Sequence, residues 1–184
     1  QRCSVPQHKG PWGLSGIRAW TRDTSSRVQI FSTKKPFDFN QIRIFAAPSD
    51  SSMSVKFLNG PDSSWYNSSI DAFEARYKKN QDTINFRLFC ENDKQNYFSL
   101  EGVQVLRGTH GLRYHAIGAN GAATHSYLKC TRFKKQLKAI SPDLVLFGLG
   151  INDAYKKSGR FDSIAFERNY DSIVKAIKSV NSDC

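Results

Sequence analysis

Two short polar loops in the C-terminal part of the chain have the residue types that stabilise a developing negative charge. The first loop is Gly-Ala-Asn-Gly-Ala at 118–122, and the second is Gly-Ile-Asn-Asp at 150–153. A glycine allows a ligand to approach the backbone N–H, and an asparagine amide donates hydrogen bonds without carrying a charge. Each loop can also be an ordinary turn, because Asn-Gly and Asn-Asp pairs are common turn residues. Neither loop alone distinguishes a functional site from an ordinary turn.

The elements predicted around these loops would place them side by side. Residues 112–117 are predicted to be a strand, and the continuous apolar run at 144–149 is typical of a buried parallel strand. Residues 124–140 and 163–180 have the periodicity of amphipathic helices. Open α/β sheets bind ligands at the carboxyl ends of their strands. Residues 109–184 therefore predict part of a doubly wound α/β fold, which needs further elements to cover its sheet.

The chain before residue 108 has a different periodicity. Apolar residues alternate with polar ones in short runs, with turn residues such as Asn59-Gly60 and Asn92-Asp93 between them. Period two is typical of half-buried strands, and several such strands suggest an antiparallel sandwich of the jelly-roll type over 1–108. The alternation slips at Gly102, where a β-bulge is expected.

The order of the two loops resembles that of the SGNH, or GDSL-type, hydrolases, a family of serine esterases and acylhydrolases. The resemblance covers only 111–184. It implies a flavodoxin-like α/β layer in which the Gly121 N–H and the Asn152 side chain form the oxyanion hole, with Asp153 supporting the loop. It implies no metal and no organic cofactor.

The family's two outer motifs are missing from this chain. The nearest imitation of Gly-Asp-Ser-Leu is residues 60–63, where a proline interrupts the motif and a hairpin turn is the better interpretation. No histidine lies in the family's Asp-x-x-His motif; the four are His8, His110, His115 and His125. His125 follows Gly121 closely enough to reach the site, but a helix-surface position is expected for it. The chain is thus expected to be the inactive middle of a hydrolase whose remaining chain supplies the nucleophile and base.

The resemblance also suggests a substrate. Some members of the family carry a carbohydrate-binding-like β-sandwich between the first and second motifs, as expected here for 1–108. The implied activity is hydrolysis of ester groups, such as O-acetyl groups, on a carbohydrate or cell-wall polymer, in a periplasmic or extracellular location. Trp12, Trp20 and Trp65 could stack on sugar rings or pack in a core, and core packing is expected for Trp20. The alternative function is a non-enzymatic carbohydrate-binding or adhesion module.

The net charge, the placement of the basic residues and the length of the apolar runs bear on which partners are expected. The chain has 27 Lys and Arg against 16 Asp and Glu, a net charge of +11, which suits an anionic polymer. The densest basic stretch, 129–138, lies on a predicted helix without interleaved aromatic residues, so a solvated face is expected and nucleic acid is not an expected partner. No apolar run is long enough for a membrane span.

The four cysteines are widely separated in the chain. Cys3, Cys90, Cys130 and Cys184 form no Cys-x-x-Cys pair, which argues against a metal site or a thioredoxin-like redox motif. Cys90 ends an apolar alternation and is expected to be buried. The spacing leaves their disulfide state open.

Overall fold

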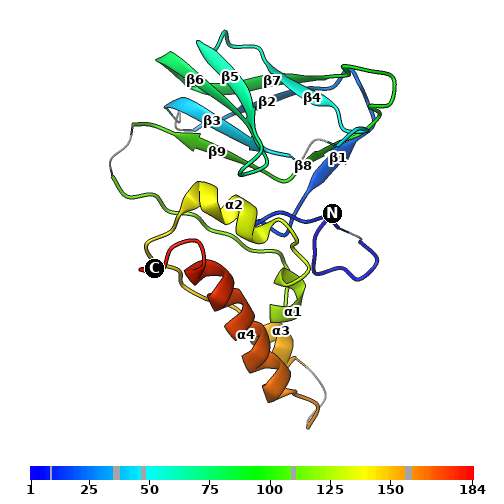
Figure 1. Cartoon of the computed structure of the whole chain (residues 1–184), viewed down its shortest axis with the longest axis vertical. Coiled ribbons are helices and arrows are strands. Elements are labelled where there is room, and N and C mark those ends of the chain that lie inside the picture. The colour runs from blue at the N-terminus through cyan, green and yellow to red at the C-terminus, as the bar shows by residue number, and fades with distance from the viewer. Residues whose placement is uncertain (9, 35–37, 47–48, 109–110, 156–158) are drawn as a thin grey trace. The chain divides into compact units, whose positions relative to one another are not determined.

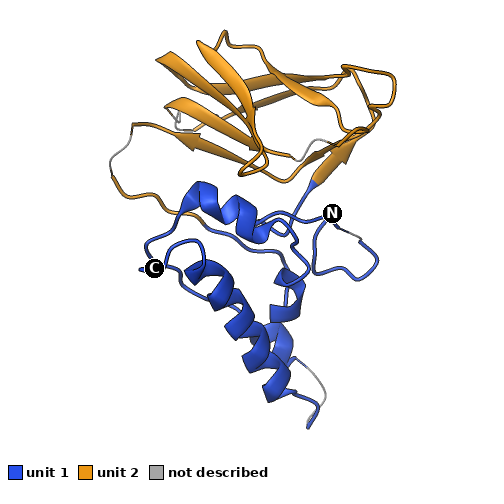
Figure 2. Ribbon diagram, viewed as in Figure 1, with its two compact units in different colours: residues 1–18, 116–184 blue, residues 19–115 orange. Residues whose placement is uncertain are grey.

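The computed structural model describes residues 1–8, 10–34, 38–46, 49–108, 111–155 and 159–184. It divides the chain into two compact units (Figure 2). Unit 1 consists of residues 1–18 together with 116–184, and unit 2 is the continuous stretch 19–115. Among the described residues, no helix has the length and apolar character needed to cross a membrane. Because unit 2 lies between the two segments of unit 1 in the sequence, unit 1 is a discontinuous unit.

Unit 2 contains the strands of the structure, arranged as three antiparallel sheets (Figure 1). The sheets have the orders β1-β8, β2-β7-β4 and β5-β6-β3-β9. The strand bounds are β1 Ala19–Thr21, β2 Arg27–Phe31, β3 Phe39–Phe45, β4 Ser54–Phe57, β5 Ser63–Asn67, β6 Ala72–Gln81, β7 Thr83–Phe89, β8 Phe98–Leu100 and β9 Gly102–Leu106.

The period-two pattern explains how these sheets hold together. Ile42 and Ile44 on β3 are fully buried, and so is Phe86 on β7. The residues that alternate with them along each strand are more exposed. These side chains belong to one hydrophobic cluster that draws on both larger sheets. Burying one face of each sheet stabilises the pair, because the apolar side chains leave water together. The predicted antiparallel strands before residue 108 are confirmed.

Two connections differ from the sequence prediction because the chain changes sheets there. The expected bulge at Gly102 is a break at Glu101, where β8 of one sheet ends and β9 of another begins. The hairpin expected at 60–63 is also wrong, since this stretch joins β4 and β5, which lie in different sheets. Gly60 has φ +60°, a conformation that glycine adopts without steric cost.

The described part of unit 1 is built from four helices and the N-terminal segment. The helix bounds are α1 Thr124–Tyr127, α2 Phe133–Ile140, α3 Ile151–Ala154 and α4 Ser163–Lys178. Its core contains Trp12 and Leu14 from the N-terminal segment, Leu137 from α2, and Ile173 and Ile177 from α4. The expected boundary grouped residues 1–18 with the sandwich, whereas the structure places them in the compact unit that contains 116–184.

The predicted helix 124–140 is interrupted. Residues 128–132 form turns between α1 and α2, with the Cys130 N–H donating to the Tyr127 carbonyl at 2.9 Å. The basic stretch 129–138 is therefore not a single helix face. The second predicted helix agrees with α4, whose first turn is capped by the Asp162 carboxylate accepting from the Ala165 N–H.

The predicted parallel strands are not formed. Residues 112–117 and 144–149 are described, and neither segment is a strand. Their large apolar side chains are mostly exposed, including Leu112 at 99% and Leu146 at 84%. A strand needs a neighbouring backbone to receive its hydrogen bonds, and neither segment pairs with one. The α/β layer is consequently not seen, and the structure is mainly antiparallel β with short helices.

Candidate functional site

The two polar loops predicted from the sequence meet in unit 1. Asn152, in the first turn of α3, donates from Nδ2 to the Ala122 carbonyl at 2.9 Å. Ala122 directly follows Gly121, which has φ +76°, and α3 begins after Gly150, which has φ +134°. Both backbone conformations favour glycine. The Asn152 amide thus lies against the loop that contains Gly121.

Asp153 joins the same two loops from the buried side. Its two carboxylate oxygens accept from the Thr124 N–H at 3.1 and 3.0 Å, and one of them also accepts from the Thr124 hydroxyl at 2.6 Å. Asp153 is 8% exposed and Thr124 is fully buried. Hydrogen bonds to a buried carboxylate are among the stronger ones in proteins, so this contact fixes α1 relative to α3.

The long helix α4 holds this arrangement from a third direction. Asn169 donates from Nδ2 to the Thr124 hydroxyl oxygen at 3.0 Å, and the Tyr170 hydroxyl donates to the Leu149 carbonyl at 2.8 Å. Thr124 therefore bridges Asp153 and Asn169. Sequence reasoning did not select Thr124 or Asn169, since a threonine and an asparagine on amphipathic helices carry no distinctive spacing.

Ser4 also reaches the first loop, from the N-terminal segment. Its Oγ donates to the Asn120 carbonyl at 2.7 Å, and a Cβ placed on Gly121 would lie 3.9 Å from it. Because the Asn120 carbonyl accepts its hydrogen, Ser4 is a loop contact and not a free nucleophile. No sequence signal indicates this contact, which joins residues 116 positions apart.

A cavity of about 260 Å³ lies beside Asp153. Its walls include the rings of Phe161 and Phe166 and the side chains of His125 and Arg168. His125 is exposed on α1, as expected for a helix-surface histidine. His110 lies outside the described residues. Within the described stretches, no group of three His, Cys, Asp or Glu side chains could hold a metal ion.

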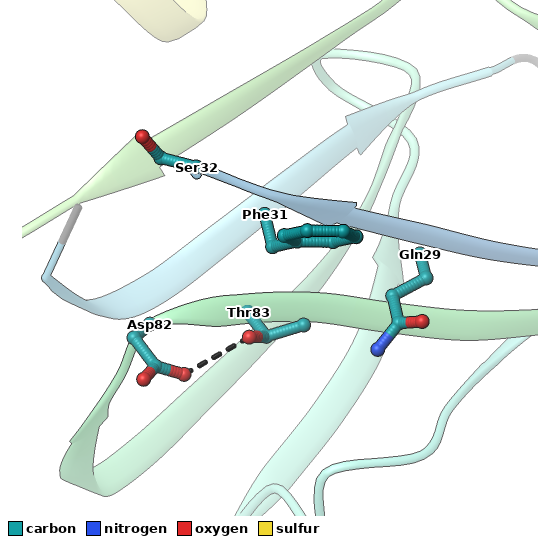
Figure 3. Close-up of a pocket in the computed structure, with 5 residues that line it drawn as sticks. All are labelled: Gln29, Phe31, Ser32, Asp82 and Thr83. Carbon is teal, nitrogen blue, oxygen red and sulfur yellow. Dashed lines mark hydrogen bonds between the residues drawn. The ribbon is translucent and has the colours of Figure 1, made fainter. Parts of the chain in front are cut away.

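Unit 2 has a second hollow, of about 340 Å³, at the edge strand β2. Figure 3 shows Gln29 and Phe31 on β2 beside Thr83, whose hydroxyl donates to the Asp82 carboxylate at 3.0 Å. Phe31 is 58% exposed. An exposed ring surrounded by amide, hydroxyl and carboxylate groups offers both a stacking surface and hydrogen-bond partners.

The three tryptophans divide between core and surface. Trp12 is buried in the core of unit 1 and is not available to a sugar. Trp20 on β1 is 49% exposed, so the core packing expected for it is wrong. Trp65 on β5 is partly exposed, and the Arg76 guanidinium lies over its ring at 5.2 Å from the centroid.

Unit 1 places an asparagine amide beside the loop that contains Gly121. An asparagine amide carries two hydrogens, and the Ala122 carbonyl takes one of those on Asn152, which leaves the other for a ligand oxygen. The neighbouring glycine offers a backbone N–H on a side without a Cβ. No model of a known protein family matches the chain, and no curated protein matches it.

Proposed function

We propose that this chain is part of an SGNH-type serine esterase that acts on ester groups, such as O-acetyl groups, of a carbohydrate or cell-wall polymer. The observation that carries the proposal is the contact between Asn152 and the Gly121 loop, supported by Asp153. It brings together the residue types that an oxyanion hole uses, in the family's chain order. The substrate class and a periplasmic or extracellular location come with the family resemblance.

The proposed reaction divides its roles between this chain and the remainder of the same hydrolase. A serine outside this chain attacks the ester carbonyl, and a histidine outside it takes the serine proton. The Gly121 N–H and the Asn152 amide then donate to the oxyanion that forms. Asp153 holds the two loops together and does not touch the substrate. The scheme requires no metal or organic cofactor.

Two exposed apolar segments, 112–117 across the sequence boundary of the two units and 144–149 in unit 1, support the idea that further strands complete an α/β layer. Residues 112–117 and 144–149 have the composition of sheet strands, yet they expose large side chains such as Tyr114 and Leu144. Parallel sheets are normally covered on both faces. In the proposed enzyme these segments become strands of a doubly wound layer, and unit 2 is the jelly-roll-type sandwich inserted into it.

The test uses a longer chain that contains the missing serine and histidine. Asn152→Ala should lower the rate of hydrolysis of p-nitrophenyl acetate by about 10² to 10³, because one oxyanion donor is lost. Asn152→Asp should lose a similar factor, since an ionised carboxylate cannot donate. The exposed Asn96 of unit 2 provides a control, and Asn96→Ala should keep the rate.

The unextended chain supplies the matching negative control. It should not hydrolyse p-nitrophenyl acetate above a protein blank, because it lacks the proposed nucleophile and base. Saturable hydrolysis that disappears in Ser4→Ala or Ser63→Ala would identify a serine of this chain as the nucleophile and would overturn this division of roles. Full activity of Asn152→Ala in the longer chain would remove the oxyanion assignment.

A second candidate function is a non-enzymatic carbohydrate-binding or adhesion module, and the exposed Phe31 favours it. In that case Phe31→Ala should abolish retention on an insoluble acidic polysaccharide, while Asn152→Ala should retain it fully. The exposed apolar Ile30, the neighbour of Phe31 on β2, provides the control Ile30→Ala. Binding that depends on Phe31 in a longer chain without esterase activity would favour the module over the enzyme.

A further inference from the structure

Two of the four cysteines lie together in the core of unit 1. Cys3 belongs to the N-terminal segment, and Cys130 lies in the turn between α1 and α2. Their exposed fractions are 1% and 4%, and a side-chain hydrogen bond joins the two thiols. Both are free in this structure. Two buried cysteines of one core whose side chains interact are candidates for a disulfide, which forms where their backbone separation allows it.

The backbone around each cysteine is held in place independently. The Cys3 N–H donates to the Gly16 carbonyl at 2.8 Å, and the Phe133 N–H donates to the Cys130 carbonyl at 2.9 Å. A third bond, from the Arg132 N–H to the Trp12 carbonyl at 3.1 Å, ties the turn of Cys130 to the N-terminal segment. The two thiols therefore meet because two anchored segments bring them together.

Space on the other side of Cys3 is closed. A Cβ placed on Gly16 would come within 2.8 Å of the Cys3 sulfur, so the side chain of Cys3 already fills the room in front of that glycine. Gly16 has φ +66°, which also favours glycine at this position. The Cys3 sulfur is therefore packed closely against Gly16.

From this geometry we infer that Cys3 and Cys130 form a disulfide that encloses the whole of unit 2 in a covalent ring closed within unit 1. The bond joins residues on either side of the interruption, since Cys3 precedes 19–115 and Cys130 follows it. It would fasten the N-terminal segment to the α1–α2 turn. The inference does not depend on the esterase proposal, because it uses neither Gly121 nor Asn152.

The chemistry is thiol–disulfide exchange, with a small disulfide such as oxidised glutathione as the oxidant. The Cys3 thiolate attacks one sulfur of the oxidant, forming a mixed disulfide and releasing one glutathione thiolate. Cys130 then loses its proton and attacks the Cys3 sulfur, which forms the protein disulfide and releases the second glutathione. Two protein thiols are oxidised, one glutathione disulfide is reduced, and the two protons end on the released thiols.

The local charges favour Cys3 as the attacking residue. The hydrogen bond from Cys130 and the nearby Lys129 ammonium lower the pKa of the Cys3 thiol to about 7 against the opposing effect of burial. The thiolate is the nucleophile, so a lowered pKa provides it near neutral pH. Because both sulfurs are buried, the exchange proceeds during folding or through local opening of unit 1.

The remaining cysteines are less suited to this role. Cys90 lies in unit 2, exposed, and its thiol donates to the Gln95 carbonyl at 3.0 Å. The burial expected for Cys90 from its sequence position is therefore wrong. Cys184 packs against the edge of the unit 1 core and is partly buried, so it serves as the competing partner that the experiment must separate from Cys130.

The experiment refolds the full unmodified chain in a glutathione redox buffer and digests it with trypsin without reductant. The expected product is one linked pair of peptides, 3–9 with 130–132, that separates on reduction. Intact mass should fall by two hydrogen atoms, and two of the four thiols should become unreactive to a thiol reagent. Free peptides 3–9 and 130–132 after refolding, or peptide 3–9 linked to a peptide containing Cys184 or Cys90, would overturn the inference.

A second measurement keeps the test decisive if a variant folds poorly. In a Cys90→Ser and Cys184→Ser background, cleavage after the exposed Arg107 or Arg113 should leave the two fragments joined until reductant is added. In the matched background with Cys90→Ser and Cys130→Ser, the fragments should separate without reductant. If the fragments stay joined to the same extent in the matched background, Cys3 pairs with Cys184 as readily as with Cys130. That result would contradict a specific Cys3–Cys130 disulfide.

Discussion

The carboxylate of Asp153 is the residue on which the candidate site depends most. It accepts hydrogen bonds from both the backbone and the hydroxyl of Thr124, and both residues are buried. Removing one partner of a buried, charged hydrogen bond leaves the other unsatisfied, which costs about 1–3 kcal/mol. The site is thus coupled to the stability of unit 1 through this one side chain.

Asp153→Asn tests this coupling with a nearly isosteric change. The NH₂ group of the new asparagine would point its hydrogens at the Thr124 donors. The free energy of unfolding of unit 1 should therefore fall by about 2 kcal/mol. The measurement is urea unfolding followed by hydrogen exchange of peptides from α1 and α2. The exposed Asp143 gives the control Asp143→Asn, which should be neutral. Equal effects of both substitutions would contradict the bridging role.

The pKa of Cys3 makes a second prediction at this scale. Cys130 donates to its sulfur and Lys129 lies nearby, so the pKa of the Cys3 thiol is about 7 and not the usual 9.0. The nearby Tyr127 hydroxyl stays neutral, because burial raises its pKa. Well below pH 7 the thiol is mostly protonated, so the rate of disulfide formation through openings that keep Cys3 beside Cys130 and Lys129 should rise through pH 7 and level off above pH 8.

Alkylation of Cys3 in Cys130→Ala provides the comparison. Loss of the hydrogen bond should raise the pKa of Cys3, and the inflection of its alkylation rate should move to higher pH. Lys129→Ala should move the inflection in the same direction by less. An unchanged inflection in Cys130→Ala would show that the contact between the thiols does not control the ionisation.

Residue types and spacing indicated Gly121, Asn152 and Asp153 together, and the structure brings their two loops into contact. They could not indicate Ser4 or Asn169. Those contacts depend on segments that are distant in the chain and that carry no motif. Whether Asn152 acts on a substrate stays a prediction.

Among the elements, α4 shows how an amphipathic pattern is used. Ile173 and Ile177 are buried in the unit 1 core, while Ile164 on the same helix is 78% exposed. Ile173→Ala should destabilise unit 1 by about 2–5 kcal/mol, because it removes buried methyl groups and leaves a cavity. Ile164→Ala should change stability by less than about 0.5 kcal/mol. Circular dichroism during thermal unfolding measures both, and similar melting shifts would contradict the assigned helix face.

The alternation of apolar and polar residues predicted the strands that bury one face. It did not predict strands that are held by backbone pairing and bury little apolar surface. Strand β5 reads Ser-Ser-Trp-Tyr-Asn, without an apolar alternation, and it is a strand because it pairs with β6 from Ser63↔Arg76 to Asn67↔Ala72. Conversely, 144–149 has the composition of a strand but no pairing segment. A strand is defined by its neighbour as well as by its own residues, and the neighbour is not visible in a local pattern.

The discontinuity of unit 1 belongs to the scale of the whole molecule, and it makes a prediction about truncation. Cys3, Trp12 and Leu14 are buried in the core that residues 116–184 complete. Deleting 1–18 should therefore unfold unit 1, whereas unit 2 should keep its own core. Amide NMR spectra of the truncated chain should retain the signals of an isolated 19–115 fragment. Loss of those signals on truncation would show that the units are not independent.

The change of periodicity near residue 108 indicated that the chain has two parts, but it could not assign residues 1–18. These residues show no helix or strand periodicity. They belong to unit 1 because Trp12 and Leu14 pack into a core whose other residues come from helices distant in the sequence. Such packing is a tertiary property.

The interrupted order of unit 1 has a consequence for synthesis on the ribosome. Residues 1–18 emerge before unit 2, but the segments they pack against begin only at 116, after all of unit 2 has been made. Every strand pair of unit 2 lies within 19–115, so this unit can fold while the N-terminal segment is still without its core. During that interval Trp12 is exposed to water and to chaperones. Translation speed across unit 2 should therefore set how long residues 1–18 remain without the segments of 116–184 that they pack against.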